Sequence, residues 1–285
     1  RPVAASLRRR GLRVDLDLAD LEQRVLPRVR YQHSLSEAEI EVARAAADGA
    51  QLVVLPELWF SGYDLARAAD YAAALDEGAF ALMAELARSH GLYLAGTSLE
   101  ANPGGRPYNT AALFGPEGEV VGAYRKVHLW APMGEVEHMA AGREFPTFDL
   151  PWGRTALAVC YDLRFPEAWR LLATAGARLV IIPAEWPAKR VEHWRLFLRA
   201  RAVENQYFVA GCNRAGIDRD PAGTAFGGYS AVSDPWGRLL VEGTMEPDLL
   251  QASLDLDEVD KARRLFPFLA DRRSDLYGPA GEHSI

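Results

Sequence analysis

The fold of this 285-residue chain is decided by the stretch Ala156-Leu-Ala-Val-Cys160-Tyr-Asp-Leu-Arg-Phe-Pro166-Glu167. Residues 157–159 form a short apolar run, which is typical of a buried strand. Pro166 suits the first turn of a helix, because the N–H that proline lacks is not needed there. Residues 168–173 continue in a helical pattern. The stretch therefore predicts a strand that ends at Cys160, turns, and leads into a helix.

Two interpretations of Cys160 follow from this placement. A thiol between a strand end and a helix start lies near unpaired backbone N–H groups. Those groups and the helix dipole favour the thiolate, which is the nucleophilic form. Most free cysteines, however, are small buried hydrophobic residues that carry no chemistry. The local sequence leaves both interpretations open.

Strands and helices alternate on both sides of this stretch. We expect strands over residues 12–18, 51–57, 92–97, 108–114, 119–125, 178–182, 207–213, 227–233, 238–242 and 250–256. We expect helices over residues 38–47, 77–89, 191–206 and 258–265, the first of them behind a Ser34-x-x-Glu37 capping box. Residues 127–153 form a long connection, and such connections are often functional. The alternation places the chain in the α/β class.

Composition limits the class of protein. With 49% hydrophobic residues, the chain suits one domain over residues 1–285, with an N-terminal arm over 1–11 and a C-terminal tail over 266–285. The net charge of −7 argues against nucleic acid or an anionic membrane as a partner. Two cysteines cannot build a disulfide framework, which favours the reducing cytoplasm. Without Cys-x2-Cys or His-Glu-x-x-His patterns, we expect neither a metal nor a cofactor.

Three polar residues directly follow three of the apolar strands, namely Glu57, Lys126 and Cys160. In open α/β sheets, ligands bind beyond the carboxyl ends of the strands. A base, a cation and a thiol at such an edge suit acyl transfer to a carbonyl or nitrile carbon. Taken singly, a solvated glutamate at a strand end and a lysine on an exposed hairpin are the simpler interpretations. Taken together, the three residues favour chemistry.

The motifs around these residues resemble those of the carbon–nitrogen hydrolase (nitrilase) superfamily. The matching stretches lie in the family's order over residues 50–277: Leu55-Pro-Glu-Leu58, Tyr124-Arg-Lys-Val-His-Leu129, Val159-Cys-Tyr-Asp-Leu-Arg-Phe-Pro-Glu167, Ala200-Arg-Ala-Val-Glu-Asn205, and Gly228 with Asp234-Pro-Trp-Gly237. The resemblance implies an αββα four-layer sandwich and a homodimer or larger homo-oligomer. It implies that Cys160 is the nucleophile, Glu57 the general base and Lys126 the stabiliser of the oxyanion.

The resemblance implies two further catalytic parts. The backbone N–H of Tyr161 would be the second donor to the oxyanion. Glu135 matches the second glutamate of the family, which orients Lys126 and the leaving group. Trp186, which follows a strand end, is a candidate pocket wall, and Tyr63 and Arg164 are further pocket candidates.

Other polar residues near these motifs have structural or functional interpretations. His128 and His138 flank the expected active-site loop and suit either a pocket or a surface. Glu204 and Asn205 suit buried hydrogen-bonding roles, and Cys212 suits the core or, alternatively, a resolving thiol. A substrate carboxylate would need a fixed cation, and the candidates are Arg164, Lys189, Arg190 and Arg195.

The stretches Ile182-Pro-Ala-Glu-Trp-Pro187 and Glu135-x-x-His138 resemble the omega-amidase-like branch of the superfamily. Members of that branch release ammonia from terminal amides of short 2-oxo or dicarboxylic acids through a cysteine thioester. N-carbamoyl amino-acid amidohydrolases and nitrilases share the same catalytic residues, so both alternatives stay open. A nitrilase-like domain that serves only as an interaction module is a third alternative, which an intact set of Glu57, Lys126 and Cys160 disfavours.

Overall fold

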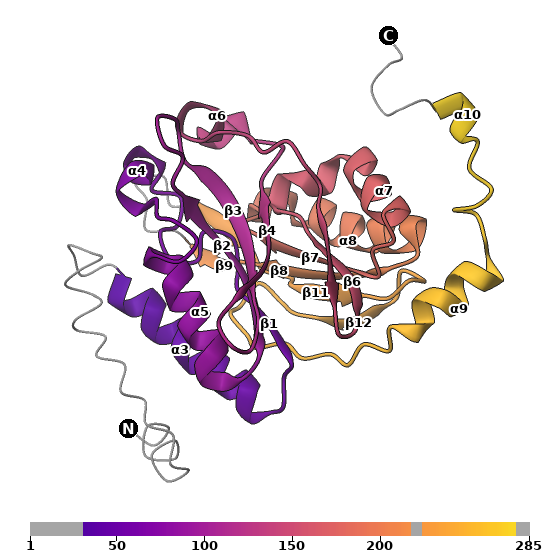
Figure 1. Cartoon of the computed structure of the whole chain (residues 1–285), viewed down its shortest axis with the longest axis horizontal. Helices are drawn as coiled ribbons and strands as arrows, with labels where there is room; N and C mark the ends of the chain where they lie inside the picture. Colours follow the sequence, from indigo (N-terminus) through magenta and orange to yellow (C-terminus); the bar gives the residue numbers. More distant parts are fainter. Residues whose placement is uncertain (1–30, 218–223, 278–285) are drawn as a thin grey trace.

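The computed structural model describes residues 31–217 and 224–277, and two β-sheets lie at its centre (Figure 1). The first sheet has the order β1-β2-β3-β4, with β1 at Leu52–Val54, β2 at Tyr93–Glu100, β3 at Tyr108–Phe114 and β4 at Val120–Arg125. The second sheet has the order β12-β11-β8-β7-β6-β5, with β5 at Thr147–Leu150, β6 at Gly153–Leu157, β7 at Leu179–Ala184, β8 at Phe208–Asn213, β11 at Ala231–Ser233 and β12 at Leu239–Glu242. A small ladder joins β9 at Ala215–Ile217 to β10 at Ala225–Gly227.

Helices cover the outer faces of both sheets (Figure 1). The first sheet is covered by α3 (Tyr31–Ala47) and α5 (Gly78–His90), and the second by α7 (Pro166–Thr174) and α8 (Val191–Asn205). The short helices are η1 (Leu65–Arg67), α4 (Ala68–Tyr71), η2 (Ala131–Met133), α6 (Glu135–His138), η3 (Cys160–Arg164) and η4 (Ala188–Arg190). At the C-terminal side, α9 (Asp257–Leu265) and α10 (Ser274–Tyr277) follow. The expected αββα sandwich is confirmed.

Strand periodicity explains why the sheets stack. Alternate residues of a strand face opposite sides of its sheet. On β3, Ala111 and Leu113 belong to the core cluster shared with the second sheet, whereas Ala112 and Phe114 pack with the residues of α3 and α5. All four side chains are fully buried. Because each large apolar side chain stabilises the fold by about 1.5–3 kcal/mol when buried, both faces of this sheet hold the sandwich together.

The decisive stretch has the predicted form. Strand β6 ends at Leu157, Cys160 opens the single turn η3, and Pro166 occupies the first turn of α7. Strands β6, β7 and β8 run parallel, because α7 and α8 serve as their crossovers. The carboxyl ends of these strands therefore meet at one edge of the second sheet.

Three local predictions are wrong. The first described helix begins at Tyr31 rather than at residue 38, so the Ser34-x-x-Glu37 motif lies inside the helix and is not its cap. Residues 250–256 form no strand with any described element, since Leu254 and Leu256 pack against the core without pairing their backbone. The connection over 127–153 contains α6 and also β5, which pairs with β6.

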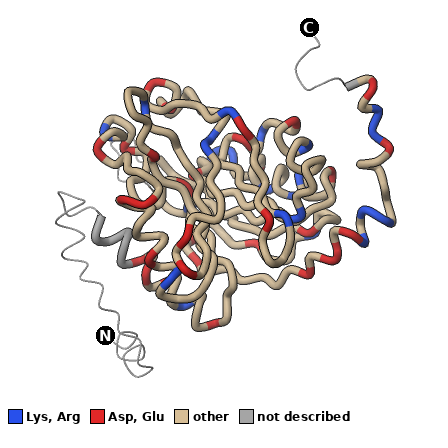
Figure 2. Tube along the Cα trace, in the orientation of Figure 1, with Lys and Arg blue, Asp and Glu red and all other residues tan. Residues whose placement is uncertain are grey.

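Some predictions lie outside the described residues, namely the arm over 1–11 and the strand over 12–18. Charges of both signs are interspersed along the trace (Figure 2), and α9 carries acidic residues in its first turn and basic residues in its last turn. That order complements the dipole of the helix. Among the described residues, no helix is long and apolar enough to cross a bilayer.

Candidate active site

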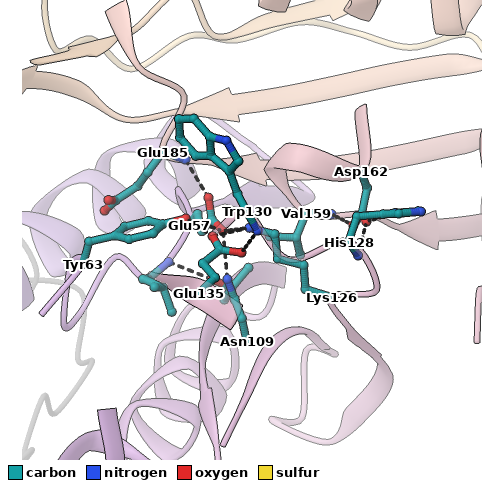
Figure 3. A network of polar contacts seen from close by, with 12 residues as sticks. Glu57, Tyr63, Asn109, Lys126, His128, Trp130, Glu135, Val159, Asp162 and Glu185 are labelled. Carbon is teal, nitrogen blue, oxygen red and sulfur yellow. Dashed lines mark hydrogen bonds and ion pairs between the residues drawn. The ribbon is translucent and has the colours of Figure 1, made fainter. Parts of the chain in front are cut away.

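The catalytic candidates gather where the two sheets meet. Glu57 follows β1 and Lys126 follows β4, so the first sheet carries both, whereas Cys160 follows β6 of the second sheet. Lys126 Nζ lies 2.9 Å from Glu57 Oε1 and 2.6 Å from Glu135 Oε1, and Figure 3 shows these side chains converging. None of these three side chains is exposed to solvent. The structure thus brings together the glutamates and the lysine that the sequence singled out.

Donors from distant parts of the chain fix the orientation of Glu57. Asn109 Nδ2 donates to Glu57 Oε1 at 2.8 Å, and the backbone N–H of Glu185 donates to Oε2 at 2.9 Å. The Tyr63 hydroxyl lies 3.3 Å from Glu57 Oε1 and shares its single proton between Glu57 and Glu135. Sequence reasoning missed Asn109 and Glu185, although Asn109 is recognisable as a polar residue near the start of a largely apolar strand. The carboxylate of Glu57 is held by an ammonium, an amide, a phenol and a backbone N–H.

Glu135 is held in a similar way. Its Oε2 accepts a 2.8 Å hydrogen bond from the backbone N–H of Trp130, and its Oε1 accepts one from the Tyr63 hydroxyl. Tyr63, expected as a pocket residue, therefore bridges the two glutamates. Burial raises the pKa of Tyr63 well above its ordinary value, and the charges of Glu135 and Glu57 add to that. The phenol remains protonated and acts as a donor at every physiological pH.

The ammonium of Lys126 is a permanent charge in this site. Burial alone would lower the pKa of Lys126, but the neighbouring Glu135 and Glu57 carboxylates raise it well above its ordinary value. Burial raises the pKa of Glu135, and the charge of Lys126 opposes this rise. One cation is shared by two buried carboxylates, and neutral donors compensate the remaining negative charge: the Asn109 amide and the backbone N–H groups of Glu185 and Trp130.

Cys160 adopts the left-handed backbone conformation, with φ at +43°. Such strain is found at functional sites, where the surrounding structure enforces it. Burial raises the pKa of the Cys160 thiol well above its ordinary value, the negative charge of Glu57 raises it further, and Lys126 opposes both. Burial therefore works against the thiolate that the helix start would favour. The resting group is a thiol beside a carboxylate that is placed to take its proton.

Comparison with known proteins agrees with this geometry. The sequence matches the family model described as "Carbon-nitrogen hydrolase" over residues 27–264. The chain belongs to the carbon–nitrogen hydrolase family. It is 40% identical over 228 residues to a 2-oxoglutaramate amidase of Bacillus subtilis, and the aligned residues cover 80% of this chain and 87% of that protein. It is 35% identical over 248 residues to the omega-amidase NIT2 of Mus musculus, covering 83% of this chain and 88% of that protein.

Solved structures give the same assignment. A carbon–nitrogen hydrolase from Helicobacter pylori superimposes with a TM-score of 0.80 at 26% identity, covering 89% of this chain and 94% of that one. An amidase mutant from Nesterenkonia sp. AN1, solved after Michael addition of acrylamide at its active site cysteine, has a TM-score of 0.74 at 32% identity, covering 86% and 92%. This carbon–nitrogen hydrolase is an amidase that acts on non-peptide C–N bonds.

The remaining pocket candidates form an aromatic and cationic wall. The Arg164 guanidinium lies 4.7 Å from the ring centre of buried Trp186. The ring of Tyr161 stacks near Trp130, with ring centres 6.0 Å apart, and Arg190 lies 5.6 Å from the centre of the Trp130 ring. Burial lowers the pKa of Arg164, and the neighbouring charge of Arg190 lowers it further. Two guanidinium groups therefore share this side of the carbon–nitrogen hydrolase site.

The structure separates the four candidate cations. Arg195 is already engaged, since it forms two 2.8 Å hydrogen bonds to the carboxylate of Glu242. Lys189 is exposed in η4. Arg164 and Arg190 form no ion pair with any carboxylate of the described residues. Among the described residues, the hydrogen-bond partner of the Arg164 guanidinium is the ring nitrogen Nδ1 of His193, at 3.3 Å. Among the three candidates without an ion pair in the described chain, Arg164 and Arg190 lie over the aromatic rings of Trp186 and Trp130, so we take these two as the cations best placed for a ligand.

Several further candidates take no part in the hydrogen bonds of the Glu57, Lys126 and Glu135 cluster. His138 is exposed, and it lines a cavity of about 930 Å³ together with Tyr63 and Cys212, but Cys160 does not line this cavity. Burial raises the pKa of Cys212 to about 12, so this thiol is inert. Asn205 is buried as expected, whereas Glu204 is partly exposed beside Arg201.

Proposed function

We propose that this enzyme hydrolyses the terminal amide of a short 2-oxo or dicarboxylic acid, such as 2-oxoglutaramate, and releases ammonia. The relatives named 2-oxoglutaramate amidase and omega-amidase support this substrate class. The observation that carries the proposal is the pairing of a buried Glu57, Lys126 and Cys160 site with a guanidinium that has no carboxylate partner in the described chain. A cysteine site explains amide cleavage, and Arg164 explains the preference for a substrate with a distant carboxylate.

In the acylation step, Glu57 takes the proton of the Cys160 thiol while the sulfur attacks the amide carbon. The carbonyl electron pair moves to oxygen, and the Lys126 ammonium and the backbone N–H of Tyr161 stabilise this oxyanion. Glu57 returns the proton to the amide nitrogen, the C–N bond breaks, and ammonia leaves. Cys160 is then bound to the acyl group as a thioester.

In the deacylation step, Glu57 takes a proton from water, and the hydroxide attacks the thioester carbon. The same two donors stabilise the second oxyanion. The C–S bond then breaks, Glu57 returns its proton to the sulfur, and the carboxylic acid product leaves. Glu135 contributes by holding Lys126, at 2.6 Å, in one position through both steps.

The distant carboxylate of the substrate would bind Arg164, with Arg190 as the second cation. Arginine presents a planar fork that suits bidentate contact with a carboxylate. The Trp186 ring beneath Arg164 holds the guanidinium in place, with 4.7 Å between them, and excludes water from one side. A short substrate would then reach from the Arg164 guanidinium to the Cys160 sulfur.

The main experiment compares kcat/KM for three matched substrates: the omega-amide of a 2-oxo acid, the N-carbamoyl amino acid, and the nitrile. We expect the amide to lead clearly. A lead for either of the other two compounds would move the enzyme to another branch of the family. Failure to turn over any amide, carbamoyl compound or nitrile would instead favour the interaction-module alternative.

A second experiment tests the carboxylate contact. Arg164→Met should raise KM by about ten- to a hundredfold, because a hydrogen bond to a charged group contributes about 1.5–3 kcal/mol. Arg195→Met is the matched control, since Arg195 is engaged with Glu242. An Arg164→Met enzyme with the KM of wild type would remove Arg164 from the substrate site.

We also propose that the enzyme is a cytoplasmic homodimer or larger homo-oligomer. Large apolar side chains lie exposed near the C-terminal side, with Leu265 at 67% and Phe266 at 58% exposure, and these support an interface between copies. Both cysteines are free thiols, which suits a reducing compartment.

A further inference from the structure

A second buried polar hub lies next to the catalytic cluster, centred on Asp162 (Figure 3). Asp162 is fully buried and accepts four hydrogen bonds. Its Oδ2 accepts from the backbone N–H of Val159 at 2.9 Å and from the Tyr124 hydroxyl at 2.7 Å. Its Oδ1 accepts from the backbone N–H of His128 at 3.1 Å and pairs with His128 Nδ1 at 2.7 Å. A carboxylate offers about four lone-pair sites, so Asp162 is fully occupied.

The four donors come from the two segments that carry the chemistry. Val159 directly precedes Cys160, and Asp162 lies two positions after Cys160. Tyr124 and His128 lie two positions before and after Lys126. One carboxylate therefore ties the turn of Cys160 to the segment of Lys126.

Additional contacts make the hub rigid. The Tyr124 hydroxyl accepts a 3.1 Å hydrogen bond from the backbone N–H of Val127. The indole N–H of Trp169 donates to the backbone carbonyl of Asp162 at 2.9 Å. The His128 ring stacks on Phe165, with ring centres 3.7 Å apart and planes 8° from parallel. The ring of His128 thus has little freedom to rotate away from Asp162.

We propose that Asp162 and His128 are positioning residues that hold Cys160 at a fixed distance from Lys126. This proposal rests on the cysteine chemistry proposed above. Cys160 has a φ of +43°, and strained backbone persists only where several contacts enforce it. A misplacement of about 1 Å in a catalytic group lowers the rate by about 10²-fold. The contacts that hold the backbone of Cys160 in its strained conformation should therefore affect turnover. Asp162 and His128 themselves move no proton in the reaction.

The test uses two variants of His128. His128→Leu removes the ring donor to Asp162, whereas His128→Asn keeps an N–H donor close to the position of Nδ1. We expect His128→Leu to lower kcat by about 10²-fold with little change in KM. We expect His128→Asn to recover most of that loss. Because His128 is only partly buried, both variants should fold.

Asp162→Asn extends the test, since an amide cannot accept all four hydrogen bonds. Its matched control is Asp234→Asn. Asp234 is also buried, and its Oδ1 accepts 2.9 Å hydrogen bonds from the backbone N–H groups of Trp236 and Arg238 in a hairpin turn. We expect both variants to lower Tm, but only Asp162→Asn to lower kcat.

Two readouts separate positioning from other roles. A positioning role predicts that kcat of His128→Leu falls at every pH while the shape of its pH profile stays that of wild type. It also predicts slower alkylation of Cys160 by iodoacetamide. A folded His128→Leu enzyme with kcat within twofold of wild type would overturn the proposal, as would loss of one limb of the profile. Alkylation can be measured even if no amide is turned over, so the failure of the proposed function stays distinguishable.

Discussion

At the scale of the residue, the charge of Glu57 helps to set the pKa of the Cys160 thiol. Burial is the main cause that raises the pKa of Cys160, Glu57 is the second, and Lys126 opposes them. Glu57→Gln removes the second cause, so the pKa of Cys160 should fall and the thiolate should form at lower pH. Turnover should nevertheless drop by about 10²–10⁴-fold, because the base is lost.

The measurement is the rate of iodoacetamide alkylation of Cys160 as a function of pH, with amide turnover measured alongside. A Glu57→Gln variant whose alkylation curve stays in place, or whose turnover survives, would mean that Glu57 is not the partner of the thiol. Cys160→Ala provides the control for alkylation elsewhere, above all at Cys212.

Lys126 also has a structural role, in addition to the catalytic role proposed for it. Lys126→Met leaves the buried carboxylates of Glu57 and Glu135 without their shared cation. Breaking a buried ion pair by removing one partner costs about 3–5 kcal/mol, so the free energy of unfolding should fall by about that amount at neutral pH. Lys189→Met, at an exposed position, should change it by less than about 0.5 kcal/mol.

The loss of stability in Lys126→Met should depend on pH. Burial and the charge of Glu57 both raise the pKa of Glu135, and without Lys126 nothing lowers it as strongly. A carboxyl with a folded-state pKa above its unfolded value stabilises the fold at low pH, and this contribution is lost as the pH rises through the folded-state pKa. Urea unfolding should therefore show that the variant regains stability on acidification. Equal destabilisation at neutral and acid pH would contradict this account.

The sequence predicts that Glu57, Lys126, Glu135 and Cys160 form the candidate site. It does not predict the groups that orient these side chains. Asn109 and the backbone N–H of Glu185 contact Glu57 across 52 and 128 residues of sequence. Contacts of such separation leave no local pattern, because they depend on how the two sheets stack. The local sequence left the protonation state of Cys160 open for the same reason.

At the scale of the element, the segment that carries Glu135 is held against the end of β4 by a glycine. The backbone N–H of Gly142 donates to the carbonyl of Lys126 at 2.8 Å. A Cβ atom at Gly142 would lie 2.1 Å from the backbone carbonyl oxygen of Arg125, which no real structure tolerates. Gly142→Ala should therefore push this segment away and lower kcat by up to about 10²-fold, as expected for a displacement of about 1 Å.

Gly105→Ala is the control for this prediction. There the nearest atoms belong to the end of the Asn102 side chain, which can turn aside. Steady-state kinetics and Tm of both variants form the measurement. Normal kcat in Gly142→Ala would show that Glu135 keeps its place independently of this contact.

Helices and strands were predictable where start and stop residues, such as proline and glycine, agree with the periodicity of the apolar residues. Pro166 marks the start of α7, and Gly91 ends α5 in the left-handed conformation. The strand expected over 250–256 fails because alternating apolar residues report burial and not backbone pairing. Strand β5 was missed because only four residues, at Thr147–Leu150, pair along it.

At the scale of the whole molecule, the active site exists only where the two sheets are stacked. The first sheet supplies Glu57 and Lys126, the proposed base and cation, and the second supplies Cys160, the proposed nucleophile. The positions of Glu57, Lys126 and Cys160 after strands predicted that the three residues lie at a shared edge. The simplest arrangement with such an edge is a single open sheet, whereas the structure has two. The four-layer sandwich was predicted only from the family resemblance, because no local sequence pattern indicates that two sheets pack face to face.

The whole molecule also exposes apolar side chains that a single copy leaves uncovered. Phe266 and Phe268 are 58% and 39% exposed after α9, and Leu276 is 58% exposed in α10, which lies away from the sandwich (Figure 1). Large aromatic side chains in such positions are typical of protein interfaces. If a second copy covers them, replacing Phe266 and Phe268 by serine should shift the mass measured by light scattering toward that of one chain.

Val120→Ser is the control, because Val120 is also exposed, at 43%, but lies on β4, far along the chain from this segment. The serine variant should keep its α/β circular-dichroism spectrum, since the side chains that it removes contribute little to the core. Its turnover per site should then report whether the interface supports the active site. A wild-type enzyme that scatters as a single chain at micromolar concentration would refute the homo-oligomer and assign the exposed phenylalanines to another partner.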